Sequence, residues 1–119
     1  MFFTPKRVEK PWGYEIWFAH TDQYVGKILH VNEGCQLSLQ YHEQKDETIY
    51  CLRGNIVIVL EQEGSFVDLS LPVGQSIRIQ PYTKHRLRGG EGGGDALEAS
   101  TSQVEDVVRC ADDYGRSGA

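Results

Sequence analysis

Cysteine is scarce in this chain of 119 residues, and its three occurrences are far apart. Cys35, Cys51 and Cys110 form no CxxC pair, and an odd, dispersed set of thiols argues against a disulfide framework and against a zinc ribbon. Long apolar runs are also missing: no stretch approaches the roughly 18 residues that a membrane-spanning helix needs, and the N-terminus lacks the apolar run of a secretory signal. We therefore expect reduced thiols in a cytoplasmic protein without a membrane partner.

Clustered positive charge is missing as well. The net charge is −5 at pH 7 and the isoelectric point is near 5.3, with no block of Lys and Arg. A nucleic-acid-binding surface needs such a block to neutralise phosphates, so we expect no nucleic-acid partner. A few converging cations can still bind a small anion, because net charge does not describe an individual pocket. The length fits a single domain over residues 1–119.

Helical periodicity is nearly absent, since only Gln103–Ala111 has a pattern that fits a helical turn or two. Short runs rich in β-branched and aromatic residues dominate instead, separated by turn residues, and this pattern predicts an all-β sandwich or barrel. We interpret Gly89–Gly94 as a flexible hairpin loop and expect Tyr114–Ala119 to fray. The predicted strands are Tyr14–Phe18, Tyr24–Val31, Gln36–His42, Thr48–Leu52, Asn55–Leu60, Phe66–Leu71, Ser76–Gln80, His85–Arg88 and Ala96–Thr101.

One predicted strand carries three polar side chains on a single face. Side chains alternate along a strand, so Ser38, Gln40 and His42 point to the same side. Glu47 begins the next strand after a polar turn, and His85 begins a later strand after a turn that contains proline. Two imidazoles, a carboxylate and an amide oxygen suit Zn²⁺, Fe²⁺, Mn²⁺, Co²⁺ or Ni²⁺. A solvated His–Glu pair and a turn histidine are the alternative interpretation.

The spacing of these residues resembles the two motifs of the cupin superfamily. Gly34-x5-Gln40-x-His42-x4-Glu47-x6-Gly54 is similar to the first motif, Gly-x5-His-x-His-x3,4-Glu-x6-Gly, with Gln40 in place of the first histidine. Gly74-x5-Gln80-x-Tyr82-x2-His85 is similar to the second, Gly-x5-Pro-x-Gly-x2-His, with Gln80 and Tyr82 in place of Pro and Gly. The resemblance implies an all-β cupin fold, a double-stranded β-helix or jelly-roll barrel. It also implies one divalent metal ion in the lumen, with zinc expected and manganese, iron, cobalt or nickel as alternatives. The implied ligands are Gln40, His42, Glu47 and His85.

A longer set of matches resembles the type II phosphomannose isomerases, which form the C-terminal cupin of bifunctional mannose-1-phosphate guanylyltransferase/mannose-6-phosphate isomerases. Leu37–His42 (LSLQYH) is similar to the family's LSLQxH segment, and Lys10–Gly13 is similar to its (R/K)PWG sequence. Residues 106–109 (DVVR) and 112–116 (DDYGR) resemble its closing DDIVR…DDYGR signature. The resemblance covers roughly residues 8–116. It implies a metal-dependent aldose–ketose isomerase that converts mannose 6-phosphate to fructose 6-phosphate through a cis-enediol, without the nucleotidyltransferase domain.

The same resemblance implies roles for charged residues outside the metal set. Glu98 falls on a glutamate of the family, and alternation places it on one strand face with Ala96 and Ser100. Glu98 is therefore the candidate proton carrier, and Lys27 is its alternative. Strand alternation puts Arg86 on the face opposite His85, although a bend after the proline weakens that argument. The cations proposed to bind the substrate phosphate are Lys27, Arg86, Arg109 and Arg116.

Two other classes of function stay open on the sequence. One is a different metal-dependent cupin enzyme acting on a sugar or small acid, such as an epimerase or an oxygenase. An oxygenase usually has a ligand set richer in histidine, so Gln40 argues against it. The other is a sugar- or metal-binding module without turnover, in which the cations are ordinary surface charges and Glu98 only forms hydrogen bonds.

A homodimer is the expected assembly, because a small open barrel has sheet edges that need covering. Four aromatic residues are expected in the core or at such an interface, with the mouth of the barrel as the alternative place. They are Trp12, Tyr14, Trp17 and Tyr41.

Overall fold

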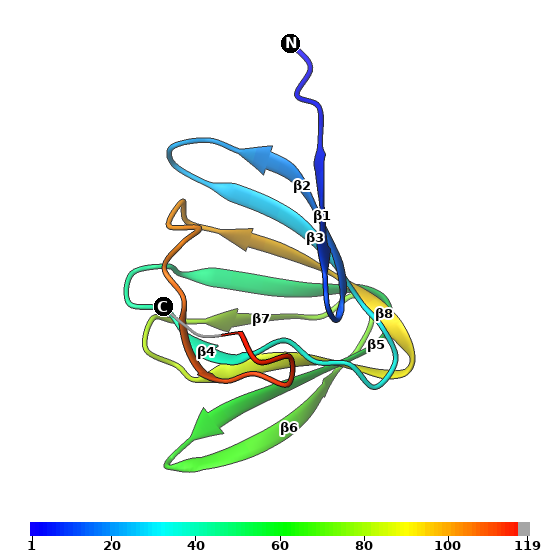
Figure 1. Ribbon diagram of the computed structural model, residues 1–119, viewed down its shortest axis with the longest axis vertical. Helices are drawn as coiled ribbons and strands as arrows, with labels where there is room; N and C mark the ends of the chain where they lie inside the picture. The colour runs from blue at the N-terminus through cyan, green and yellow to red at the C-terminus, as the bar shows by residue number, and fades with distance from the viewer. Residues whose placement is uncertain (117–119) are drawn as a thin grey trace.

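The computed structural model describes residues 1–116, and these contain nine β-strands and no helix (Figure 1). No helix among the described residues is long and apolar enough to cross a membrane. The predicted fraying of the tail concerns 114–119, of which 117–119 lie outside the described residues. The strands are β1 (Lys6–Lys10), β2 (Gly13–His20), β3 (Val25–Val31), β4 (Leu39–Tyr41), β5 (Glu47–Gln62), β6 (Ser65–Leu71), β7 (Ser76–Ile79), β8 (His85–Ser100) and β9 (Val108–Ala111).

The strands form one antiparallel sheet that curls into a half-barrel, which confirms the predicted all-β class (Figure 1). Strands β1, β2, β3, β8, β4 and β9 follow one another along the sheet, while β5 pairs with β6, β7 and β8. The N-terminal segment extends away from the curled sheet at the top of Figure 1.

The segment 103–111 contributes a strand where the sequence pattern allowed a helical turn. Within it, β9 pairs with β4 and aligns Arg109 with Gln40. The short strand β4 has an open edge, and backbone hydrogen bonds to that edge outweigh the weak local helical preference of this segment. The C-terminal segment is thereby placed against β4, which carries the predicted metal ligand Gln40 and is directly followed by His42.

The glycine-rich segment 89–94 lies inside β8 and is not the hairpin loop that the sequence suggested. A Cβ atom built on Gly93 would lie 2.6 Å from the carbonyl oxygen of Val31, and one on Gly54 would lie 2.5 Å from the carbonyl oxygen of Gly93. Both glycines also have positive φ angles, 71° and 76°. Glycine is needed here because neighbouring backbones approach too closely for a side chain.

The two long strands, β5 and β8, change which alternate residues face the interior. In β8 the buried positions include His85, Leu87 and Gly89 at the start and Ala96, Glu98 and Ser100 at the end. In β5 they include Glu47, Ile49 and Cys51 and later Ile56, Ile58 and Leu60. The pairing of β5 with β8 shifts register between Cys51 and Arg53 and again between Gly54 and Ile56. The buried positions at the two ends of each strand are an odd number of residues apart, so strict alternation would turn one end outward. The irregular pairing in the middle lets side chains at both ends face the interior.

The apolar core fills part of the interior and is built around side chains of β3, β5 and β8. Trp12, Leu29, Ile49, Ile58 and Leu87 are all nearly or fully buried within one contact cluster. Burying each large apolar side chain contributes about 1.5–3 kcal/mol. Trp12 is therefore a core residue, as the sequence suggested, and it also lines the cavity described below.

Candidate metal centre and adjoining cavity

Three of the four predicted metal ligands converge in the interior. His42 follows β4, Glu47 begins β5 and His85 begins β8, and each has one ligand atom within 4.8 Å of the others'. The Oε2 atom of Glu47 lies 3.3 Å from Nε2 of His42, and its Oε1 atom lies 3.3 Å from Nε2 of His85. All three side chains are buried.

Hydrogen bonds to backbone carbonyls fix the orientation of both imidazole rings. Nδ1 of His42 donates to the carbonyl oxygen of Asp106 at 2.6 Å, and Nδ1 of His85 donates to that of Thr83 at 2.8 Å. A carbonyl oxygen can only accept, so Nδ1 of each ring carries a proton, and in the neutral tautomer Nε2 carries the lone pair. This is the arrangement of a metal-binding histidine, whose other nitrogen donates to a carbonyl or a carboxylate.

The inner atoms of the cluster fit a bound cation. Nε2 of His42 and Nε2 of His85 are buried and have no hydrogen-bond partner among the described residues, and the buried Oε2 atom of Glu47 lies 3.1 Å from Nζ of Lys45. The Nε2 atom of each ring lies 3.3 Å from an oxygen of Glu47. A nitrogen lone pair and a carboxylate oxygen at that distance repel each other unless a proton or a cation lies between them. Donor atoms that share one ion at ~2.0–2.2 Å are themselves ~3–3.5 Å apart. A single divalent ion held by His42, Glu47 and His85 would therefore satisfy all three atoms together.

The predicted fourth ligand, Gln40, lies beside this cluster. It is aligned with His85 across the pairing of β4 with β8, and it lines the same cavity as His42. Its Oε1 atom accepts a hydrogen bond from the Ser38 hydroxyl at 3.3 Å. Ser38, Gln40 and His42 thus all face the cavity, which confirms the strand face that alternation predicted.

Tyr82 occupies the place of a glycine in the second cupin motif and takes a glycine-like conformation. Its φ angle is 67°, a region that side chains disfavour. Its backbone N–H donates to the carbonyl oxygen of His42 at 2.7 Å, and its ring stacks on that of Tyr41 with centroids 6.0 Å apart. These contacts fasten the turn before His85 to the segment that carries Tyr41 and His42.

Lys45 is a residue of the site that the sequence pattern did not identify, because it falls in the polar turn between His42 and Glu47. Its side chain is buried, and Nζ lies 3.1 Å from Oε2 of Glu47 and 3.0 Å from Oε2 of Glu98. Burial disfavours the charged form of Lys45, but the carboxylates of Glu98 and Glu47 outweigh burial and raise its pKa above the ordinary value. The available signal was its position two residues before Glu47, on the same face if the strand is extended backward.

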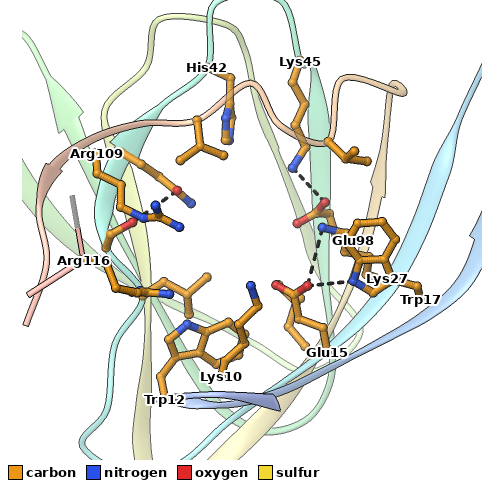
Figure 2. Close-up of a pocket in the computed structure, with 16 residues that line it drawn as sticks. Lys10, Trp12, Glu15, Trp17, Lys27, His42, Lys45, Glu98, Arg109 and Arg116 are labelled. Atoms are coloured by element: carbon orange, nitrogen blue, oxygen red, sulfur yellow. Dashed lines mark hydrogen bonds and ion pairs between the residues drawn. The ribbon is translucent and has the colours of Figure 1, made fainter. Parts of the chain in front are cut away.

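A cavity of about 130 Å³ adjoins the cluster and has strongly charged walls (Figure 2). Glu15 and Glu98 line it on the acidic side, and Glu98 is buried as predicted from its strand face. Trp12 and Trp17 supply aromatic wall. The cations that line it are Lys10, Lys27, Lys45, Arg109 and Arg116.

Lys27 lies in a small network with two residues of β2. Its Nζ atom is 3.6 Å from Oε1 of Glu15 and 4.1 Å from the ring centroid of Trp17. The Trp17 indole N–H donates to the same Glu15 oxygen at 2.8 Å (Figure 2). Lys27 is also the register partner of Glu98 across β3 and β8. The two candidate proton carriers are therefore neighbours on the cavity wall.

The structure does not bring Arg86 to this cavity. Its Nε atom donates to the carbonyl oxygen of Leu37 at 2.8 Å, and its terminal nitrogen pairs with Asp113 at 3.3 Å. Arg86 follows His85 on β8, so its side chain leaves the strand on the opposite face. It fastens the C-terminal segment instead, and Lys10 of β1, which sequence analysis left without a role, lines the cavity.

The C-terminal segment forms one wall of the cavity and is fastened to the metal-ligand loop by Asp106. Its carboxylate accepts the backbone N–H groups of Glu43, Gln44 and Lys45 at 3.0, 2.6 and 2.9 Å. Burial alone would raise the pKa of Asp106, but these three hydrogen bonds hold it below its ordinary value. The segment that supplies Arg109 and Arg116 is thereby fixed to the segment that supplies His42 and Lys45.

No protein-family model matches this sequence, and no curated protein sequence is significantly similar to it. Similar solved structures do exist. KdgF from Halomonas sp. aligns with a TM-score of 0.69 at 20% identity, covering 87% of this chain and 90% of KdgF. An RmlC-like cupin from Shewanella frigidimarina aligns with a TM-score of 0.69 at 14% identity, covering 88% of this chain and 93% of that one.

A third similar structure is larger than this chain. Oxalate decarboxylase from Bacillus subtilis aligns with a TM-score of 0.78 at 13% identity, covering 89% of this chain but 30% of the decarboxylase chain. At such identities the alignments establish the fold alone. This chain has the all-β cupin fold, as the two motifs implied.

Proposed function

We propose that this chain is a metal-dependent isomerase that interconverts an aldose phosphate and a ketose phosphate, with mannose 6-phosphate and fructose 6-phosphate as the pair. One observation carries the proposal: a buried carboxylate, Glu98, adjoins the metal cluster through Lys45 and is separate from the three ligands that converge. An isomerase needs such a base next to its metal, whereas a pure binding module does not. Oxalate decarboxylase, one of the similar structures, is an enzyme that acts on a small acid, and this is in keeping with an enzyme on the same fold.

The chain's own residues supply most of the chemistry. A divalent ion held by Gln40, His42, Glu47 and His85 would act as a Lewis acid toward the two oxygens of the substrate's reacting carbons. Glu98 takes the proton from C2 of the aldose and returns it to C1, while the hydroxyl proton passes from O2 to O1 through the cis-enediol. Lys27 and Lys45 flank Glu98 and offer N–H donors to the oxygen that gains negative charge.

A remote phosphate would bind on the cationic wall. Lys10, Arg109 and Arg116 line the cavity, and a phosphate accepts hydrogen bonds from such groups strongly because both partners are charged. Fixing the phosphate holds the reacting carbons in place at the metal, which turns binding energy into rate. A small carboxylic acid fits the same wall, so the substrate class is the part of the proposal that an experiment must decide.

The decisive experiment combines metal analysis with turnover assays. Purified protein is loaded with Zn²⁺, Mn²⁺, Fe²⁺, Co²⁺ or Ni²⁺ and assayed with hexose and heptose phosphates, with the same sugars lacking phosphate, and with oxalate. We expect stoichiometric metal, isomerisation of a sugar phosphate and little activity on the free sugar. His42→Ala should remove both metal and activity. Turnover of oxalate alone, or stoichiometric metal without any turnover, would reject the isomerase.

A further inference from the structure

Two buried carboxylates in the interior share one ammonium group. Lys45 is 5% exposed, Glu47 is 3% exposed and Glu98 is 5% exposed. Nζ of Lys45 lies 3.1 Å from Glu47 and 3.0 Å from Glu98, so it contacts both at ion-pair distance. Figure 2 shows the contact with Glu98. A buried carboxylate without a positive partner is strongly unfavourable, and here a single lysine serves two of them.

The oxygen that Lys45 contacts on Glu47 is one that faces the metal cluster. Oε2 of Glu47 is 3.1 Å from Nζ of Lys45 and 3.3 Å from Nε2 of His42. A cation bound between Glu47 and His42 would therefore neutralise the charge that Lys45 neutralises in this structure. Two cations close to one carboxylate oxygen repel each other, and that repulsion is large where water is excluded.

We propose that Lys45 is an internal counter-ion that takes the place of the metal's charge in the metal-free protein. When an ion binds, the ion pair between Lys45 and Glu47 breaks and the ion pair between Lys45 and Glu98 remains. The two carboxylates then each have one positive partner, the ion for Glu47 and the ammonium group for Glu98. This inference rests on the metal-ligand cluster and does not depend on the substrate or on isomerase activity.

Two measurable consequences follow from sharing Lys45 between two carboxylates. Removing the ammonium group removes both a competitor for Glu47 and a positive charge beside the ion, so metal should bind more tightly. Removing it also leaves Glu47 and Glu98 without a counter-ion when no metal is present. The metal-free protein should therefore lose stability, and metal should restore more stability than it does in the parent protein.

The test uses Lys45→Met, which keeps the length of the side chain and removes its charge. Affinity for Zn²⁺ and for Mn²⁺ is measured by competition with a chromogenic chelator, and melting temperature is measured with and without each ion. We expect at least about tenfold tighter metal binding than in the parent, a lower melting temperature without metal and a larger rise on adding it. If Lys45→Met does not fold without metal, Lys45→Gln replaces it with the same expectation.

The matched control is Lys27→Met, because Lys27 is also a buried lysine paired with a buried glutamate, Glu15, but it does not contact the metal cluster. Its metal affinity should stay within about threefold of the parent's, the range that a more distant charge produces. The sharing of Lys45 between two carboxylates is tested with Glu98→Gln. This change removes the charge of Glu98, so that Glu47 is the one carboxylate that still pairs with Lys45. This change should weaken metal binding in the parent and have a smaller effect in the Lys45→Met background, because the competition then no longer exists.

Several results would overturn the inference. Unchanged metal affinity in Lys45→Met would show that Lys45 does not compete with the ion, and weaker affinity would show that it holds Glu47 in place for the ion. A parent protein without measurable affinity for any of these ions would also refute it. Failure of the isomerase assay in a protein that binds metal would reject the proposed function and leave the role of Lys45 standing.

Discussion

The backbone carbonyl oxygen of Asp106 lies 2.6 Å from Nδ1 of His42, while the carboxylate of the same residue accepts three backbone N–H groups from the loop that follows His42. Asp106 thus orients the metal ligand His42 through its main chain. Its side chain supports the loop that contains Lys45. The C-terminal segment that forms one wall of the cavity is therefore directly hydrogen-bonded to the segment that carries His42.

Replacing Asp106 should therefore affect both stability and metal binding. Asp106→Ala removes the acceptor of three N–H groups, and we expect a loss of about 1–3 kcal/mol in the free energy of unfolding. Metal affinity should fall as well, because the displaced segment no longer fixes the His42 ring. Chemical denaturation of the metal-free protein and a metal titration measure the two effects. Asp106→Asn, which keeps one acceptor oxygen, should be intermediate in both; lost stability with parental metal affinity would assign Asp106 a structural role only.

Glu98→Gln tests the proton carrier. The amide keeps the size of the side chain but cannot accept the C2 proton, so we expect isomerisation to fall at least ~100-fold, the lower end of a general acid–base contribution. The fold should be retained, and the assay is run at saturating metal so that altered metal affinity does not contribute. Exchange of the substrate's C2 proton with solvent is followed by NMR. Exchange at the parental rate would move the role to Lys27 or to another group.

Lys10→Ala tests the cationic wall. The lysine lines the cavity, and removing one charged donor should weaken binding of the sugar phosphate about tenfold or more while metal content stays the same. Lys6→Ala, on the same strand but outside the cavity lining, is the control. Calorimetry with phosphorylated and free sugar separates a phosphate contact from a general effect. Equal losses for both sugars, or a loss in Lys6→Ala of the same size, would contradict the assignment.

Acid should weaken the C-terminal segment through Asp112. Hydrogen bonds from Arg116 lower the pKa of Asp112 to about 2. Because the folded-state pKa lies below the unfolded value of about 3.8, the stabilisation is fully present above the unfolded value. It is lost as the pH falls through about 2. The free energy of unfolding should therefore drop more between pH 4 and pH 2 in the parent than in Asp112→Asn. Asp113→Asn, next to it and half-exposed, is the control; identical pH profiles for parent and Asp112→Asn would contradict this account.

Strand alternation was enough to predict the faces that carry the chemistry. The positions of His42, Glu47 and Glu98 followed from counting along short strands, and the structure places all three in the interior. Local periodicity works here because one face of each strand is buried and the other is exposed. Arg86 illustrates the same rule, since alternation already placed it opposite His85 and the structure agrees.

Other features depend on contacts that no local pattern contains. Lys45 looks like a residue of a polar turn, and only the approach of β8 reveals that two carboxylates surround it. Lys10 and Glu15 reach the cavity because β1 and β2 pair along the edge of the sheet. The run of glycines at 89–94 looks like a loop in the sequence. Glycine is needed there because the backbone of other strands lies too close for a side chain, and this contact is visible only in the structure.

The interior faces of β8 carry a constraint on chain length. His85 and Glu98 both point inward although their positions differ by an odd number, and the change of face occurs within the segment 90–95, between Gly89 and Ala96. Adding or deleting one residue there would turn either the metal ligand or the candidate base to the outside, while a change of two residues would restore both. Among sequence variants of this barrel, lengths of that segment that differ by an even number should be compatible with function, and lengths that differ by an odd number should not.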